Sequence, residues 1–256
     1  MELDYDALLT LTTEVGYRLQ VNGAEIYRVE ESMQRILQAY GVQGGEVFAI
    51  PSCIIVGLTT PDGQPLTRIR RIRAQGTDLE RLEAYNDLCR VVCEHRPDLD
   101  MAWALLDRIS SGCRSVSPAG QLVGYFLATG AFSLFYGGSW QDGLCGGLCG
   151  VAIGLCLSFM TRMGANLFFK TIAGAAVSGV LALLLTWVGL GEHTEYIIIG
   201  ALMALVPGTL FTYAMRDIMA GDMVAGISKG AEALLIGAAI ALGTGFALAL
   251  ARSIGG

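Results

Sequence analysis

Long stretches without any charged residue fill the second half of the chain, and they constrain its fold more than any other feature. These stretches are residues 115–141, 143–161, 171–191, 196–215 and 233–251. A helix of about 19 residues or more matches the roughly 30 Å hydrocarbon core of a bilayer. The sequence therefore predicts a bundle of five transmembrane helices. Their expected bounds are about 118–138, 143–161, 168–190, 195–215 and 229–251.

The first half differs, because most of the charged residues of this 256-residue chain precede Ser117. We expect a cytoplasmic domain over residues 1–116 and a transmembrane domain over residues 117–256. Helical spacing of apolar residues and a turn at Pro61-Asp62-Gly63 predict an α+β fold for the first domain. Its expected helices cover residues 4–21, 24–40, 77–95 and 97–111, and its two or three short strands lie within residues 46–72.

The direction of insertion follows from the cations. The acidic start, MELDYDALLT, lacks the basic region and continuous apolar core of a secretory signal, so we expect the N-terminus in the cytoplasm. The loop cations fall in every second loop, and therefore on one side of the membrane: they are Arg114, Arg162, Lys170, Arg216 and Lys229. Retained cytoplasmic loops carry such an excess, which predicts a multi-pass protein of the cell (inner) membrane with its C-terminus outside.

Composition argues against several functional classes. The net charge is −6, whereas proteins that bind nucleic acids carry basic surfaces, so no nucleic-acid partner is expected. With only two histidines and no phosphate-cradling loop, the sequence predicts no enzyme, no cofactor and no metal site. The seven cysteines, Cys113 among them, are expected to be reduced and structural.

A Pro-Gly pair interrupts the fourth uncharged stretch, where Pro207 is the twelfth residue of residues 196–215. Proline removes a backbone donor and glycine leaves helical geometry easily, so a break near the bilayer midplane is expected. Transporters use such broken helices as substrate or ion sites. A proline kink repaired by neighbouring helices is the alternative interpretation. Thr209 follows directly and belongs to the same expected path.

Other polar residues flank the spans. Asp217 would lie about 15 Å from the break along the helix, where it either relays protons or pairs with Arg216 or Lys229. Asp142 has the same two interpretations, and Asn166 either lines the path or caps the third span. Glycine-rich helix faces fit close helix contacts, so we expect self-association or a membrane-protein partner besides lipid.

Several segments resemble the threonine/serine exporter family. They are NGAEIYRVEESMQRIL, TDLERLEAYNDL, FYGGSWQDGL, ANLFF and LVPGTLFTYAMRDIMAGDMVAGISKG, the last being the most specific. The chain is similar to the larger, N-terminal-half subunit of the split two-component form, in which a smaller membrane protein supplies the remaining spans. The best-known split pair is associated with succinate export.

The resemblance implies a secondary exporter of small polar metabolites, threonine and serine or a dicarboxylate, driven by a proton or ion gradient. It assigns Pro207, Gly208, Asp217, Asp142 and Asn166 to the family's membrane positions. It also matches Gly23, Ala24 and Glu25 to a GAE motif in the first domain, where Glu25 also suits a helix N-terminus. Thr129 stands where many members have a serine, which leaves fine substrate preference open.

An alternative function follows from the long first domain. A membrane-anchored sensor or scaffold would bind a ligand or protein with that domain, while the spans mainly anchor it. Helix breaks and glycine-rich faces favour the exporter.

Overall fold

The computed structural model describes residues 3–73, 75–112 and 116–255, so Arg114 and Cys113 lie outside the described residues. These residues form ten helices and three strands in two compact units. The first unit holds residues 1–114 and 212–230, and the second unit holds residues 115–211 and 231–256.

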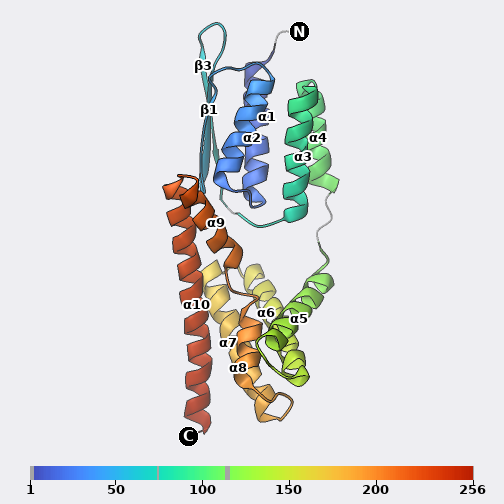
Figure 1. Ribbon diagram of the computed structural model, residues 1–256, viewed down its shortest axis with the longest axis vertical. Coiled ribbons are helices and arrows are strands. Elements are labelled where there is room, and N and C mark those ends of the chain that lie inside the picture. The colour runs from blue at the N-terminus through green and yellow to red at the C-terminus, as the bar shows by residue number, and fades with distance from the viewer. Residues whose placement is uncertain (1–2, 74, 113–115, 256) are drawn as a thin grey trace. The chain divides into compact units, whose positions relative to one another are not determined.

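The first unit is built from helices and an antiparallel sheet (Figure 1). Its elements are α1 (Tyr5–Val21), α2 (Ile26–Ala39), β1 (Glu46–Ile50), β2 (Cys53–Thr59), β3 (Pro65–Arg71), α3 (Leu79–His95) and α4 (Leu99–Gly112). The strand order is β1-β2-β3, and β2 pairs with both neighbours. The sheet lies against α1 and α2, and α3 and α4 cover the opposite side of that helix pair. The predicted helices and strands of this region are confirmed.

Local sequence explains where these elements begin. The Asp4 carboxylate accepts hydrogen bonds from the backbone N–H groups of Asp6 and Ala7 and so caps α1, and Asp78 caps α3 in the same way. Between β2 and β3, Gly63 has a φ of +81°, which glycine adopts without strain. The predicted turn at this position is therefore confirmed.

Residues from the end of the chain also belong to the first unit. They come from α9 (Gly208–Met219) and from the start of α10 (Met223–Gly255). Ala225 of α10 is fully buried in the same apolar core as Leu8, Ile26 and Met33. The domain boundary expected from the sequence, at residue 116, assigns residues 212–230 to the transmembrane domain instead. That boundary stays a prediction.

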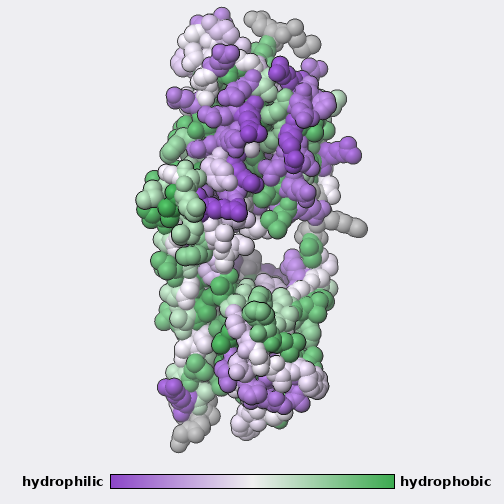
Figure 2. All heavy atoms as spheres, in the orientation of Figure 1, coloured by the Kyte–Doolittle hydropathy of each residue, from purple (hydrophilic) through white to green (hydrophobic). Residues whose placement is uncertain are grey.

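The second unit consists of helices. They are α5 (Pro118–Phe135), α6 (Trp140–Arg162), α7 (Leu167–Trp187), α8 (Thr194–Leu202), the first turn of α9 and the larger part of α10. Among the described residues, three helices are long and apolar enough to cross a membrane: α6, α7 and α10 up to Ser253. The count of five spans stays a prediction. Figure 2 shows polar side chains gathered over the first unit, while apolar ones cover much of the second unit apart from a polar patch at its lower end, on the face drawn.

Small residues let the helices of the second unit approach closely. A Cβ atom added at Gly146 would lie 2.0 Å from the Ser133 hydroxyl of α5, and one at Gly243 would lie 2.3 Å from the Ile172 carbonyl of α7. Cys145 and Cys149 are buried free thiols in the same packed region. Backbone approach of this kind is how helices associate in lipid.

Candidate functional site

The segment around Pro207 is not helical in the second unit. Helix α8 ends at Leu202 and α9 begins at Gly208. The Leu205 N–H donates to the Leu202 carbonyl at 2.8 Å, and the Phe211 N–H donates to the Pro207 carbonyl at 3.0 Å. Proline disfavours helical geometry in the residue before it and has no N–H of its own, so one helix ends and another starts here.

Asp142 is fully buried at the start of α6, where it joins two loops. One carboxylate oxygen accepts from the backbone N–H groups of Glu192 and His193 at 2.7 and 3.0 Å. The other accepts from the Ser139 N–H at 2.9 Å and from the His193 ring at 3.0 Å. Ser139 and Asp142 also form a capping box at the N-terminus of α6. Asp142 therefore fixes the α7–α8 loop to the start of α6.

The same place contains a possible metal-ligand set that sequence spacing did not reveal, because its members lie about 50 residues apart. One ligand atom each from Asp142, Glu192 and His193 lies within 4.8 Å of the others. Both Asp142 oxygens already accept hydrogen bonds, and an ion would have to displace them. The expectation of no metal stays a prediction.

The contact of His193 with Asp142 makes stability depend on pH. Hydrogen bonding to Asp142 raises the pKa of the His193 imidazole, whose side chain is 47% exposed. A raised folded-state pKa stabilises the protein below the unfolded value of about 6.5, and this contribution is lost as pH rises through the folded value. We expect the thermal midpoint to fall as the pH rises above about 6.5, with a smaller fall in His193→Gln. Equal profiles for both proteins in a thermal unfolding series would contradict this expectation.

Thr129 lies at the contact between α5 and α6. Its hydroxyl lies 2.7 Å from the Tyr125 carbonyl and 2.9 Å from the Gly146 carbonyl, and it is fully buried. Ser133, one turn later, is equally buried and packs against Gly200 of α8. Sequence reasoning missed Ser133. A hydroxyl shared between backbone carbonyls serves helix contact, so a role of Thr129 in the solute path stays a prediction.

Asn166 caps a helix in the structure. Its side-chain oxygen accepts the Phe169 N–H at 3.0 Å, which satisfies one of the unpaired donors at the start of α7. The capping interpretation is confirmed, while a role in the solute path stays a prediction.

Asp217 forms a buried ion pair in the first unit. Its Oδ2 atom accepts a hydrogen bond from the Lys229 Nζ atom at 2.7 Å, and the two side chains are 0% and 6% exposed. Of the two partners expected from sequence, Lys229 is the one observed. The Oδ1 atom is buried without a hydrogen-bond partner in the described part of the chain. Burial of a carboxylate oxygen without a hydrogen-bond partner lowers the stability of the fold. Asp217 is therefore a candidate functional group.

The GAE motif meets the Asp217 region through Arg216. Gly23 has a φ of +101°, which favours glycine. Glu25 is the N-cap residue of α2, at the expected helix N-terminus; it is 5% exposed and its side chain makes no capping hydrogen bond. Its carboxylate pairs instead with Arg28 at 3.3 Å and with Arg216. The first unit thus brings Glu25 and Asp217 to neighbouring parts of one charged region.

The structure groups the expected site residues by unit. Thr129, Asp142, Asn166 and residues 207–209 belong to the second unit, and residues 23–25 and Asp217 belong to the first. Thr129 and Asp142 lie on the α5–α6 pair. Lys229, expected from the sequence as a possible partner of Asp217, joins these residues as a candidate on the observed ion pair.

Comparisons with known proteins agree on one family. The family model ThrE, described as "Putative threonine/serine exporter", matches residues 10–251. A curated relative of Mycobacterium tuberculosis named "Probable threonine/serine exporter" is 23% identical over 241 residues. The match includes 92% of this chain and 45% of the relative, so the chain spans about half the length of that protein. No solved structure matches the chain.

The family match and the apolar helices together identify a protein of the cell membrane. The family is described as one of exporters, which are transporters and not enzymes. The chain belongs to the threonine/serine exporter family.

Proposed function

We propose that the chain is a subunit of a secondary transporter that exports small polar metabolites, with threonine and serine as first candidates and a dicarboxylate such as succinate as the alternative. The interruption between α8 and α9 is the observation that carries the proposal. The curated relative's name supports the amino acids. In this proposal the spans number five, the N-terminus is cytoplasmic and the C-terminus is outside.

The interruption supplies polar backbone groups where a small solute could bind. Proline at 207 cannot donate to the Met203 carbonyl, as a residue in an unbroken helix would. Non-helical backbone at membrane depth is tolerated where it is buried in protein or lines a wet cavity. We infer that groups of residues 203–209 bind the carboxylate or ammonium of the solute, as discontinuous helices do in other transporters.

The Asp217–Lys229 pair is our candidate for coupling to a proton or ion gradient. Protonation of Asp217 would remove the negative charge that holds the Lys229 ammonium, whose distance to Oδ2 is 2.7 Å. The paired and unpaired states of Asp217 and Lys229 would then differ in free energy. Coupling of transport to a gradient requires two such states. Asp142 is a less suitable candidate because its oxygens already accept four or more hydrogen bonds.

A second membrane protein completes the transporter in this proposal. The relative is about twice as long as the matched region, which leaves room for a further set of helices. A smaller subunit, or a second copy of this chain, would supply them. The assembled transporter would then work by rocking one set of helices against the other.

Counterflow in liposomes tests the proposal. Vesicles loaded with unlabelled threonine should accumulate labelled threonine when the chain is reconstituted with any smaller membrane protein that co-purifies with it. Pro207→Ala with Gly208→Leu should lower the initial rate by about tenfold or more, equivalent to about 1.4 kcal/mol of barrier. Pro118→Ala is the control, because proline at the first position of α5 replaces no helical donor.

Three results would contradict parts of the proposal. Normal flux in the Pro207 and Gly208 variant would exclude the interruption as the path. Succinate flux without threonine flux would identify a dicarboxylate, and not an amino acid, as the transported solute. Ligand binding without flux of any solute would favour the membrane-anchored sensor or scaffold.

A further inference from the structure

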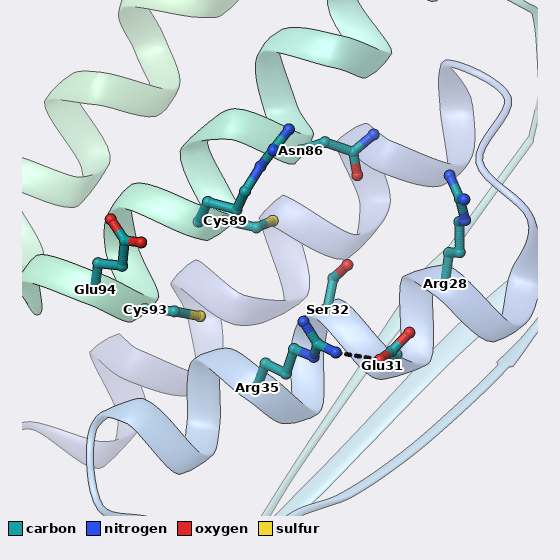
Figure 3. A pocket seen from close by; sticks show the side chains of 9 residues that line it. Arg28, Glu31, Ser32, Arg35, Asn86, Cys89, Cys93 and Glu94 are labelled. Carbon is teal, nitrogen blue, oxygen red and sulfur yellow. Dashed lines mark hydrogen bonds and ion pairs between the residues drawn. The ribbon is translucent and has the colours of Figure 1, made fainter.

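A polar pocket lies between α2 and α3 in the first unit (Figure 3). Its volume is about 510 Å³, within the roughly 300–1,000 Å³ typical of small-molecule sites. Residues three, four and seven apart lie on one face of a helix, and each helix contributes such a face. Helix α2 contributes Arg28, Glu31, Ser32 and Arg35, and α3 contributes Asn86, Cys89, Arg90, Cys93 and Glu94.

Two guanidinium groups of this pocket contact carboxylates one turn away on the same helix. The Arg35 Nη2 atom lies 2.6 Å from Glu31, as the dashed line in Figure 3 shows, and the Arg90 Nη2 atom lies 2.6 Å from Asp87. A guanidinium has five N–H donors, so one such contact leaves donors for a second carboxylate. Planar paired donors of this kind suit carboxylate recognition.

One carboxylate of the pocket is not paired with a cation. Glu94 has no ion-pair partner among the residues that the structure describes. In Figure 3, Cys93 lies between Glu94 on α3 and Arg35 on α2. An acceptor for an ammonium and a donor for a carboxylate therefore line the same pocket.

The thiols of the pocket are neutral at physiological pH. Burial raises the pKa of the Cys89 thiol to about 12, and burial also raises the pKa of Cys93. A thiol acts as a nucleophile or metal ligand mainly as a thiolate. Cys89 and Cys93 therefore contribute uncharged groups to the lining of the pocket. Recognition must come from the surrounding charges and from the Ser32 hydroxyl and Asn86 amide.

Those charges favour a ligand that carries both signs. A dicarboxylate would meet Glu31 and Glu94 as well as the guanidinium groups, and a simple cation would meet Arg28, Arg35 and Arg90. Like charges in one site repel, whereas opposite charges attract. A zwitterion can place each of its charges beside an opposite one.

We propose that this pocket binds a free amino acid, with the α-carboxylate on Arg35 and the α-ammonium on Glu94. The Ser32 hydroxyl and Asn86 amide provide hydrogen bonds for a polar side chain. The proposal needs neither the interrupted helix nor the coupling pair. With a cytoplasmic N-terminus, the site would sample the internal amino-acid pool.

Titration calorimetry on the full chain in detergent tests this site. The probes are L-threonine, N-acetyl-L-threonine, which lacks the ammonium, and L-threonine methyl ester, which lacks the carboxylate. We expect saturable binding of L-threonine, with at least tenfold weaker binding of both blocked compounds. Arg35→Gln and Glu94→Gln should each weaken L-threonine binding about tenfold or more, because each removes one charge contact.

Two controls separate this site from the proposed solute path. Arg68→Gln removes an exposed arginine that pairs with Asp6 outside the pocket, and it should leave binding unchanged. Pro207→Ala with Gly208→Leu should also leave this binding unchanged, even where flux is lost. Absence of saturable binding would overturn the proposal. Binding that survives both pocket substitutions but is lost in the Pro207 and Gly208 variant would overturn it as well.

Discussion

Lys229→Ala should destabilise the protein more than any other single substitution considered. The change leaves the fully buried Asp217 carboxylate without the ammonium that contacts it at 2.7 Å. Removal of one partner from a buried pair costs about 3–5 kcal/mol, because the remaining charge is neither solvated nor compensated. The thermal midpoint of the purified protein should therefore fall by roughly 6–20 °C, at about 2–4 °C for each kcal/mol.

A double variant separates loss of the pair from loss of packing. Asp217→Asn with Lys229→Met removes both charges and keeps similar volumes, so it should recover much of the lost stability. Lys170→Ala is the matched control, because this lysine has no ion-pair partner among the described residues. A double variant as unstable as Lys229→Ala would show that the pair does not set the stability of this segment.

Gly243→Ala should have the second-largest effect. An added Cβ atom would lie 2.3 Å from the Ile172 carbonyl and 2.8 Å from the Ala175 Cβ atom, so α7 and α10 must move apart. Overpacking of this kind costs about 1–3 kcal/mol. Thermal unfolding in detergent should show a lower midpoint for this variant.

Gly237→Ala on the same helix is the matched control for that prediction. A Cβ atom at Gly237 meets no other described atom within 4 Å, and alanine favours a helix over glycine by up to about 1 kcal/mol. The control should therefore be as stable as the parent or more stable. If both variants unfold at the same temperature, close contact between α7 and α10 does not contribute to stability.

Local features of the fold were predictable from sequence because each depends on a few adjacent residues. Pro207 lacks a donor and restricts Val206, which is sufficient reason for α8 and α9 to be separate. Asn166 is followed by an apolar run, and its capping role comes from the side-chain type alone. Spacing of apolar residues likewise predicted the helices of the first unit.

Long-range pairs were not predictable in the same way. Arg216 pairs with Glu25, 191 residues away, and Asp142 binds a loop about 50 residues later. No periodicity links such positions, and only the path of the chain brings them together. The position of residues 212–230 in the first unit has the same cause, because a run of apolar residues does not say which core it joins.

Accessibility of residue 209 tests the central proposal most directly, which is that the interruption between α8 and α9 holds the solute. Thr209→Cys in reconstituted vesicles should react with a membrane-impermeant thiol reagent above the background of the native cysteines. Saturating transported solute should slow this reaction several-fold, while Val177→Cys on an apolar face of α7 should stay unreactive. Failure of residue 209 to react, or reaction at a rate that no transported solute changes, would contradict the account.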